Sequence, residues 1–332
     1  MGNELQTTGE MNTKVSIVII TKDTKELLKD LLNSIKNDLS LQPYVGKIII
    51  IDNASADATE EVIREKFPAV VYVKNERNMG FAFSANKGTS LAEDEYILFL
   101  NSDTVLMRGE LEKMVCFMDN NADVAICGPQ LVYPDMKLQR SFAAVPSLAR
   151  ELIPLRKNRG QGLGVRGQRP DSLIHDSRTF DVGSLIGAAI LVRRTTLKAL
   201  NGFDERFFFF LEETDLCVRV WQAGRKVVFF PEARIIHLQG KTVRKSWISG
   251  RIEYNISLHK FIKKHHTPVY FGIFVVVRFI KALFLVVLFP LFFFGKRMRM
   301  KYTYYVRLIS WYFRSCPDNA GLRPKDGQTV TL

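Results

Sequence analysis

The chain has 332 residues, of which 47% are hydrophobic and 24% are charged. This composition excludes a disordered or collagen-like protein, because such chains cannot bury enough apolar surface. The formal net charge of +13 suggests a polyanionic partner, which can be nucleic acid, an anionic membrane or a phosphorylated substrate.

The excess of positive charge is confined to one part of the chain. Residues 1–240 carry 30 Lys and Arg against 31 Asp and Glu, whereas residues 241–314 carry 15 Lys and Arg against a single acid, Glu253. The same basic stretch contains the most apolar run of the sequence, residues 269–294. Hydrocarbon flanked by basic clusters favours an anionic membrane surface over nucleic acid. The alternative is the buried core helix of a soluble protein.

The first part of the chain alternates short β-branched runs with amphipathic segments. Strands are predicted at residues 15–20, 47–51, 70–74 and 96–100, and helices at 25–38, 58–66, 81–91 and 109–120. This alternation predicts βαβ units around a mostly parallel sheet.

The remaining elements are less regular. Further strands are predicted at 124–128, within 180–192, at 226–230 and at 234–237, and helices at 194–200 and 247–265. The Gly- and Arg-rich stretch 156–172 is expected to be a mobile loop. The four cysteines form no CxxC or paired pattern, so reduced cytosolic thiols are expected and a zinc site is not.

Polar clusters follow three of the predicted strands, at residues 21–23, 52–55 and 101–103. Ligands of open parallel sheets bind beyond the carboxyl ends of the strands. Three such clusters at one sheet edge therefore predict a small-molecule site there.

The chemistry of these clusters suits a nucleotide and a metal. Asp52 and Asn53 can pair with the imide edge of uracil or thymine, although an Asx turn or helix cap is the alternative. Asp103 offers a hard oxygen ligand for Mg²⁺ or Mn²⁺, or else caps the following helix. His237, at the end of a late strand, is either structural or within reach of the same metal.

A second acidic cluster follows four consecutive phenylalanines, 207–210. Glu212 and Glu213 emerge beside this apolar bulk, which tends to raise a carboxyl pKa and suits a general base. The alternative is an acidic helix start favoured by the helix dipole. Asp215 and Arg219 have the i, i+4 spacing of a structural ion pair.

The ordered set of motifs resembles the inverting family 2 glycosyltransferases of GT-A fold, and most closely their bacterial rhamnosyltransferase-like members. The matching stretches are 15–23, 51–57, 75–88, 99–103, 187–194, 202–216 and His237. The resemblance implies an α/β fold with a Rossmann-like, mostly parallel sheet flanked by helices.

The resemblance also implies site roles. The residues expected to bind the nucleotide-sugar are Thr21, Asp52, Asn53, Asn78, Gly80, Asn86, Ser102 and Asp103. Asp103 and His237 would hold Mg²⁺ or Mn²⁺. Glu213 stands where the catalytic base usually is, with Glu212 as the alternative. Asp204 and Glu205 are assigned to the acceptor or the membrane.

The implied reaction is a single displacement on a nucleoside-diphosphate sugar, with dTDP-rhamnose favoured, and a lipid-linked or glycan acceptor in cell-surface polysaccharide synthesis. The alternatives are a UDP-sugar donor (galactofuranose, galactose or N-acetylhexosamine) and a non-catalytic nucleotide-binding membrane scaffold. A sugar nucleotidyltransferase is disfavoured, because no glycine follows the first strand in Thr21–Lys25.

The predicted organisation is a disordered tail at 1–13, a catalytic domain at 14–240, membrane-associating helices at 241–316 and a tail at 317–332. Basic clusters on both flanks of the apolar run favour an in-plane or re-entrant segment at the cytoplasmic face of the bacterial inner membrane, broken near Pro290. A single tilted span is the alternative.

Two cations interrupt the apolar run. Arg278 and Lys281 are spaced i, i+3 and therefore share one helical face. They either meet a polyprenyl pyrophosphate or extend to lipid headgroups by snorkelling.

Overall fold

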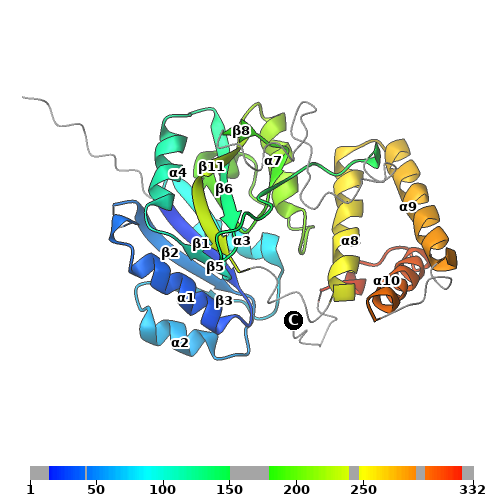
Figure 1. Ribbon diagram of the computed structural model, residues 1–332, viewed down its shortest axis with the longest axis horizontal. Coiled ribbons are helices and arrows are strands. Elements are labelled where there is room, and N and C mark those ends of the chain that lie inside the picture. Colours follow the sequence, from blue (N-terminus) through cyan, green and yellow to red (C-terminus); the bar gives the residue numbers. More distant parts are fainter. Residues whose placement is uncertain (1–14, 42, 150–178, 239–246, 289–295, 324–332) are drawn as a thin grey trace, which may run out of the picture.

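The computed structural model describes residues 15–41, 43–149, 179–238, 247–288 and 296–323. Figure 1 shows a layered α/β body joined to a group of C-terminal helices. The predictions made for residues 1–13, the loop 156–172 and the break at Pro290 lie outside the described residues.

The body is built on one mixed sheet. Its described strands are β1 (Val15–Thr21), β2 (Val45–Asp52), β3 (Val71–Lys74), β4 (Tyr96–Asn101), β5 (Thr104–Leu106), β6 (Val124–Val132), β8 (Phe180–Asp181), β10 (Ala189–Arg193) and β11 (Lys226–His237). The order is β3-β2-β1-β4-β10-β6-β11-β5, with β8 also paired to β11. The first four strands in this order are parallel, and β10 is antiparallel to both of its neighbours. The mostly parallel sheet predicted from the sequence is confirmed.

Both faces of the sheet are covered, which explains why its strands are apolar throughout. Along β1, Ile17 and Ile19 point into one layer and Val18 points into the other, and all three are fully buried. The first layer is completed by α1 (Lys25–Lys36), α2 (Thr59–Lys66) and α4 (Glu110–Asp119). The opposite layer is completed by α3 (Phe81–Leu91), α6 (Arg194–Ala199) and α7 (Glu212–Gln222).

Three strand predictions differ from the structure. The two late strands are one strand, β11, with a register shift between Phe230 and Arg234. Pro231 lies in this interval and lacks the N–H that a regular ladder needs. In the sequence, this proline therefore indicates the end of one strand and the start of another. The strand expected within 180–192 is divided into β8, β9 (Ser184–Leu185) and β10, and β9 pairs with β7 (Phe142–Ala143). The three-residue strand β5 is too short for any periodicity.

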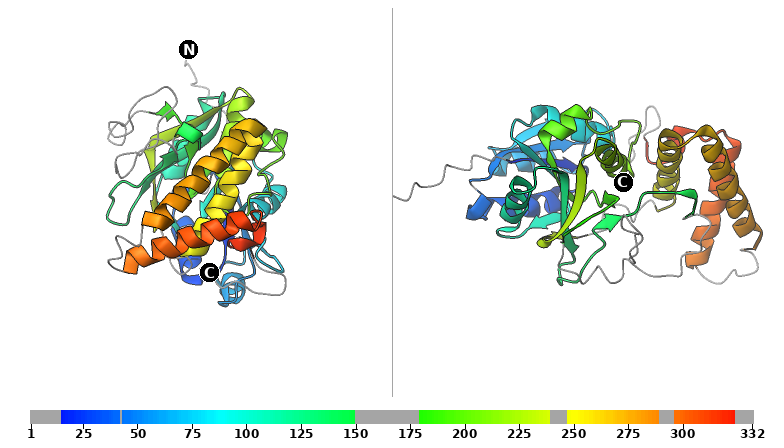
Figure 2. Two further views of the ribbon diagram at one scale, coloured as in Figure 1. Left: turned by 90° about the vertical axis from the view of Figure 1, so that its right-hand side faces the viewer. Right: turned by 90° about the horizontal axis from the view of Figure 1, so that it is seen from above.

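The C-terminal helices are α8 (Trp247–His265), α9 (Pro268–Leu288) and α10 (Lys296–Phe313). Phe274 of α9 packs near Phe261 of α8, while Ala282 packs near Ile252 and against Leu308 of α10. The helices α8 and α9 therefore run antiparallel along their length, as Figure 2 also shows.

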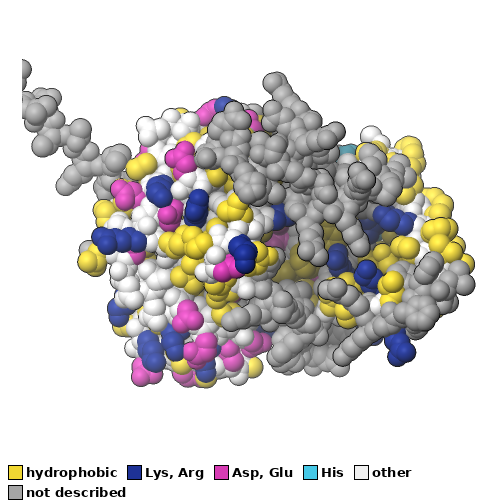
Figure 3. Space-filling view, viewed as in Figure 1, with side chains coloured by type: hydrophobic (Ala, Val, Ile, Leu, Met, Phe, Trp, Pro, Cys, Tyr) yellow, Lys and Arg dark blue, Asp and Glu magenta, His cyan; other side chains and the backbone are white. Residues whose placement is uncertain are grey.

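The outward face of α9 is apolar. Its exposed side chains recur with helical period at Val269, Ile273, Val276, Ile280, Leu283, Phe284 and Val287. Among the described residues, α9 is the one helix long and apolar enough to cross a membrane, and few of its side chains are buried. Figure 3 shows these hydrophobic side chains gathered at the end of the molecule that α9 forms.

Candidate active site

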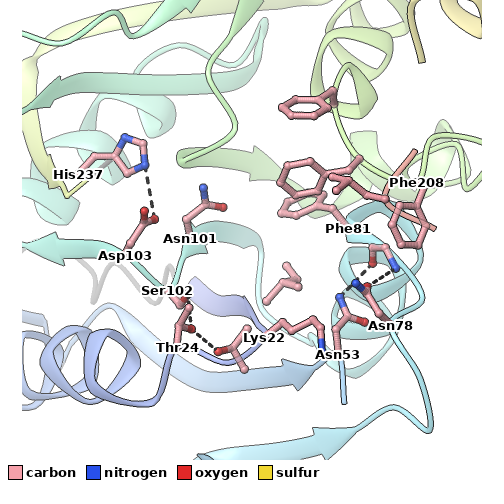
Figure 4. Close-up of a pocket in the computed structure, with 16 residues that line it drawn as sticks. Lys22, Thr24, Asn53, Asn78, Phe81, Asn101, Ser102, Asp103, Phe208 and His237 are labelled. Carbon is pink, nitrogen blue, oxygen red and sulfur yellow. Dashed lines mark hydrogen bonds and ion pairs between the residues drawn. The ribbon is translucent and has the colours of Figure 1, made fainter. Parts of the chain in front are cut away.

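A cavity of about 410 Å³ opens at the carboxyl ends of β1 and β4. Figure 4 shows Asp103 and His237 on one side of it and Asn53 and Asn78 on the opposite side. The residues predicted from the sequence that line it are Thr21, Asn53, Asn78, Gly80, Ser102, Asp103 and His237. The sheet edge thus brings together residues as far apart in the chain as Thr21 and His237.

Strand pairing brings Asp103 and His237 together. The chain turns after β4 and immediately forms β5, which pairs antiparallel with the end of β11 so that Thr104 lies opposite His237. The N–H of Leu238 donates to the carbonyl oxygen of Asp103 at 2.8 Å. This pairing leaves Nε2 of His237 3.4 Å from Oδ1 of Asp103. Asp103 is not a helix cap, because α4 begins only at Glu110.

Gln139 determines the tautomer of His237. Its amide Nε2 donates to the carbonyl oxygens of His237 at 2.5 Å and Val132 at 3.2 Å, so its Oε1 faces Nδ1 of the ring at 3.1 Å. In the neutral imidazole Nδ1 therefore carries the proton, which leaves the lone pair of Nε2 for a cation bound between His237 and Asp103.

Two facing electron-pair donors fit a divalent cation. A carboxylate and an imidazole with a fixed tautomer are suitable ligands for Mn²⁺ or Mg²⁺. Among the residues that the structure describes, no group of three or more His, Cys, Asp or Glu side chains forms a complete metal site. A cation held by Asp103 and His237 would need its other ligands from elsewhere, for example from a bound diphosphate or water.

A chain of hydroxyl groups forms the cavity floor. The hydroxyl of Thr24 donates to Oγ of Ser102 at 2.8 Å and lies 2.7 Å from the hydroxyl of Thr21. Beside them Lys22, largely buried, donates to the carbonyl oxygen of Ala54 at 3.2 Å. Lys22 is the one lysine or arginine among the described lining residues. The sequence showed it in a strand-end cluster but gave no reason to choose it over its neighbours.

Asn53 holds the opposite wall in place. Its Oδ1 accepts hydrogen bonds from Nδ2 of Asn75 at 2.9 Å, from Ser84 Oγ at 2.8 Å and from the N–H of Met79 at 3.3 Å. Its Nδ2 donates to the carbonyl oxygen of Gly80 at 3.3 Å. This buried amide therefore fixes the segment that carries Asn78 and Gly80.

Only a glycine fits at position 80. Its φ is +84°, and a Cβ there would come within 2.4 Å of the carbonyl oxygen of Phe208. That same carbonyl accepts the N–H of Phe81 at 2.8 Å. The close approach joins the nucleotide-side wall to Phe208–Phe210, which line the cavity and which the sequence identified only as apolar bulk.

Asp52 and Asn86 do not line the cavity. Oδ1 of Asp52 accepts from the N–H and hydroxyl of Ser55, and Oδ2 accepts from the hydroxyl of Tyr72 at 2.6 Å. Asn86 exchanges hydrogen bonds with the backbone of Phe203 and donates to Glu205 at 2.8 Å. In this structure, the polar atoms of both side chains hold the loops around the site.

Glu212 and Glu213 open α7, beside β9 and β10. Burial raises the pKa of Glu213 to about 7, and its side chain lies 3.5 Å from where a Cβ on Gly187 would be. Burial and the charge of Glu213 raise the pKa of Glu212 well above its ordinary value. Neither carboxyl lines the cavity, but Ala188, next to Gly187, accepts the N–H of the lining residue Asn101 at 2.9 Å.

The other acids of this segment are paired. Asp215 forms the expected ion pair with Arg219 at 2.8 Å and also contacts Lys264 of α8 at 2.6 Å. Asp204 pairs with Arg206 and with the same Lys264. These contacts link α7 and its preceding loop to the C-terminal helices.

The segment after α10 also reaches the site. Leu322 is 4% exposed and lines the cavity, and its N–H donates to Oε2 of Glu253 at 2.9 Å. The sequence assigned residues 317–332 to a tail, and an isolated leucine among polar residues carries no signal that could have corrected this.

Residues 16–199 match the profile of Glycosyl transferase family 2. The chain belongs to this family. It is 25% identical over 236 residues to an N-acetylglucosaminyl-diphospho-decaprenol L-rhamnosyltransferase of Mycobacterium tuberculosis, covering 66% of this chain and 75% of the relative. It is 24% identical over 235 residues to a rhamnosyltransferase of Escherichia coli K12, covering 67% and 83%. The chain is therefore a glycosyltransferase.

Solved structures share the architecture. A mannosyltransferase from Pyrobaculum calidifontis in complex with GDP-Man and Mn²⁺ superposes with a TM-score of 0.56 at 15% identity, covering 93% of this chain and 88% of that one. The structure of GalNAc-T7 with UDP, GalNAc and Mn²⁺ gives 0.56 at 14% identity, covering 92% and 57%. These likenesses establish a GT-A-like fold.

Proposed function

We propose that this glycosyltransferase transfers rhamnose from dTDP-rhamnose to a lipid-linked or glycan acceptor in cell-surface polysaccharide synthesis. The observation that carries the proposal is the facing pair of Asp103 and His237 at the cavity edge, 3.4 Å apart. The choice of rhamnose is supported by the two relatives described above, which are rhamnosyltransferases.

The donor diphosphate is proposed to lie between Asp103 and Lys22. Asp103 and His237 would hold Mn²⁺ or Mg²⁺, which when bound neutralises charge on the leaving diphosphate. Two structures of similar fold contain Mn²⁺ with a nucleotide or nucleotide-sugar. The ammonium of Lys22, which is ion-paired with Asp23 at 3.2 Å and lines the same cavity as Thr21, Thr24 and Ser102, would contact the diphosphate from this floor.

The nucleoside is proposed to lie against the wall that Asn53 fixes, with Asn78 and Gly80 at its edge. Asp52 supports this wall from behind through Ser55 and Tyr72. Asn86 acts in the same indirect way by holding the loop at Phe203 and Glu205.

Glu213 is proposed as the base that takes the proton of the acceptor hydroxyl. As the proton moves to the carboxylate, the acceptor oxygen bonds to the anomeric carbon and the bond from that carbon to the diphosphate oxygen breaks. One displacement from the opposite face inverts the anomeric centre, and no covalent enzyme intermediate is required. A pKa of about 7 suits this role, because the carboxylate is available near neutral pH and still basic.

The enzyme is further proposed to bind the cytoplasmic face of the membrane through the helices at 247–313. The support is the exposed apolar face of α9. Lys260, Lys263 and Lys264 are in the last turns of α8 and therefore lie near the start of α9, whereas Lys301 lies with Lys281 and Leu285 nearer its end. Because α8 and α10 pack on the other side of α9, its exposed apolar face is one-sided, which favours a segment in the plane of the membrane. The assignment of Arg278 and Lys281 to the acceptor or the membrane belongs to this proposal.

Donor binding and transfer should be separable by two variants. Asp103→Asn should weaken Mn²⁺-dependent binding of dTDP-rhamnose in a thermal-shift titration, because it removes a charged ligand. Glu213→Gln should keep that binding and lose transfer by about 10²-fold or more. Asp135→Asn, which removes an exposed carboxylate paired with Lys137, is the control and should change neither.

The same titration tests the donor. dTDP-rhamnose should bind more tightly than UDP-galactofuranose, UDP-galactose or UDP-N-acetylhexosamine. Tighter binding of a UDP-sugar would overturn the donor, and transfer at the wild-type rate by both active-site variants would overturn the site.

A further inference from the structure

The three C-terminal helices enclose a second cavity, of about 460 Å³, that shares no lining residue with the catalytic cavity. Each helix contributes positive charge to it: α8 contributes Arg251, α9 contributes Arg278 and Lys281, and α10 contributes Lys301. None of its described lining residues is acidic. A concave site with this charge attracts an anion.

Buried polar groups orient part of this cluster. Asn255, which is 1% exposed, accepts a hydrogen bond from the guanidinium of Arg278 and donates to the hydroxyl of Tyr304 at 2.7 Å. The guanidinium of Arg278 also lies 5.6 Å from the ring centre of Phe274, and that of Arg251 lies 5.4 Å from the ring centre of Trp247. Side chains held in this way lose less conformational entropy when they bind a ligand.

The donors in the cavity suit phosphate. Guanidinium groups present paired N–H donors that match phosphate oxygens, and ammonium groups add point charge. Tyr254, Tyr304 and Tyr305 line the same cavity, and the amphipathic rings of tyrosine are favoured at the level of lipid headgroups.

The position of the cavity on α9 identifies the kind of phosphate. Arg278, Lys281 and Leu285 face the cavity, while Val276, Ile280 and Phe284 are exposed on the outer side of the same helix. A helix that is cationic on one side and apolar on the other lies at the boundary between headgroups and acyl chains. Figure 3 shows Lys and Arg side chains beside the hydrophobic ones on these helices.

We propose that this cavity binds the phosphate of an anionic membrane lipid, while the outer face of α9 enters the acyl layer. The bound headgroup would hold the three helices at one depth and thereby set the orientation of the catalytic body on the membrane. The proposal rests on the membrane binding proposed above for these helices and adds the site that recognises the lipid; it requires no sugar donor and no acceptor.

The test compares two double variants that remove the same charge from the full chain. The double variant Arg251→Gln with Lys301→Gln removes two exposed cationic side chains that line the cavity. Arg307→Gln with Arg314→Gln removes two exposed cations of α10 and its end that do not line the cavity. Binding is measured by co-flotation, without donor, to vesicles of phosphatidylcholine alone or mixed with phosphatidylglycerol.

Both pairs should lose the general attraction of two charges for an anionic surface. The cavity pair should bind the phosphatidylglycerol vesicles about tenfold more weakly than the control pair, because it also loses charge-assisted hydrogen bonds. Binding to phosphatidylcholine alone should be weak and equal. Thermal stabilisation by dTDP-rhamnose and Mn²⁺ should be the same in all proteins, which checks folding separately from the transfer reaction.

Two results would overturn the proposal. One is equal binding of the two pairs to phosphatidylglycerol vesicles, which would reduce the cavity to general surface charge. The other is stabilisation of the wild type by inorganic phosphate that is lost only in the cavity pair while vesicle binding is unchanged, which would make this a site for a soluble phosphate.

Discussion

Glu213 and Glu212 are adjacent acids with different environments. Burial raises the pKa of Glu213 to about 7, and Glu212 rises further because it is also buried and faces the charge of Glu213. Burial thus favours the protonated form of both acids, and more strongly at Glu212, which also faces the charge of Glu213. Glu213 is therefore the acid that becomes a carboxylate at the lower pH, and so the one available as a base near neutral pH.

This order predicts the pH profile of transfer. The kcat/KM should rise through pH 7 and level off above it, because the free enzyme must have Glu213 ionised. A glutamate with an ordinary pKa would place this limb near pH 4.5. Steady-state rates with saturating metal across pH 5 to 9 check the prediction. A limb near 4.5, or full activity in Glu213→Gln with loss in Glu212→Gln, would contradict it.

The sequence identifies the residues that face a ligand more reliably than the residues whose side chains hold neighbouring loops in place. Asp103 is predicted from its place after a strand and His237 gains its metal role from the family resemblance, and the two side chains do lie 3.4 Å apart. Asn86 and Asp52 have equally polar side chains, but their partners, Phe203 and Tyr72, are 117 and 20 residues away. Only the fold shows that these atoms are already occupied.

At the scale of elements, β5 and β11 carry the metal-side wall, and Gln139 joins β6 to β11 beside it. It is buried and bonds the backbone carbonyls of Val132 and His237 as well as the imidazole. Gln139 is thus a positioning residue for His237.

Gln139→Leu should raise the Mn²⁺ concentration needed for half-maximal transfer by about 10- to 100-fold, because the imidazole loses its fixed tautomer and orientation. Transfer at saturating Mn²⁺ should fall much less. The measurement is a metal titration of the transfer rate, with Mn²⁺ affinity by calorimetry as a second readout.

Gln130→Leu is the matched control. Gln130 is buried in the same segment and donates to the carbonyl of Gln139 and to Ser141, but it does not contact His237. It should lower thermal stability without changing the metal requirement. An equal shift in metal requirement for both variants would show that Gln139 acts only through the stability of the segment.

The elements that periodicity could predict are those with long uniform runs. The buried strand β1 and the amphipathic helix α1 each have a uniform pattern of apolar residues. Their observed bounds agree with the predicted ones to within two residues. β5 could not be found because its three residues are strand only through pairing with β11. The antiparallel insertion of β10 likewise depends on tertiary contacts and not on local propensity.

At the scale of the whole molecule, the +13 charge separates two parts with different tasks. The catalytic part is nearly neutral, and its cavity holds one lysine among the described lining residues. The basic excess lies on the helices that carry the exposed apolar face. This division could be predicted from the sequence because it depends on composition alone. The contact between the two parts could not be predicted from the sequence, because it depends on which buried side chains pack against each other in the folded protein.

Glu253 is the clearest of these contacts. It lies on α8, is fully buried, and binds the N–H of Leu322, which lines the catalytic cavity. Its other oxygen has no hydrogen-bond partner among the described residues. Burial raises its pKa from 4.5 to about 7.

The raised pKa means that the folded protein binds an extra proton between pH 4.5 and 7. Stability from this group is therefore present below pH 4.5 and is lost as pH rises to 7. Glu253→Gln does not titrate, and its amide oxygen can still accept the N–H of Leu322. At pH 8 the free energy of unfolding of this variant should exceed that of the wild type by up to about 3 kcal/mol. At pH 4.5 the two proteins should have nearly equal free energies of unfolding. Urea unfolding at both pH values measures this, with the exposed Glu65→Gln as a control of equal charge change. A Gln variant that is less stable than the wild type at pH 8 would instead mean that the junction between the catalytic body and the helices uses an ionised Glu253.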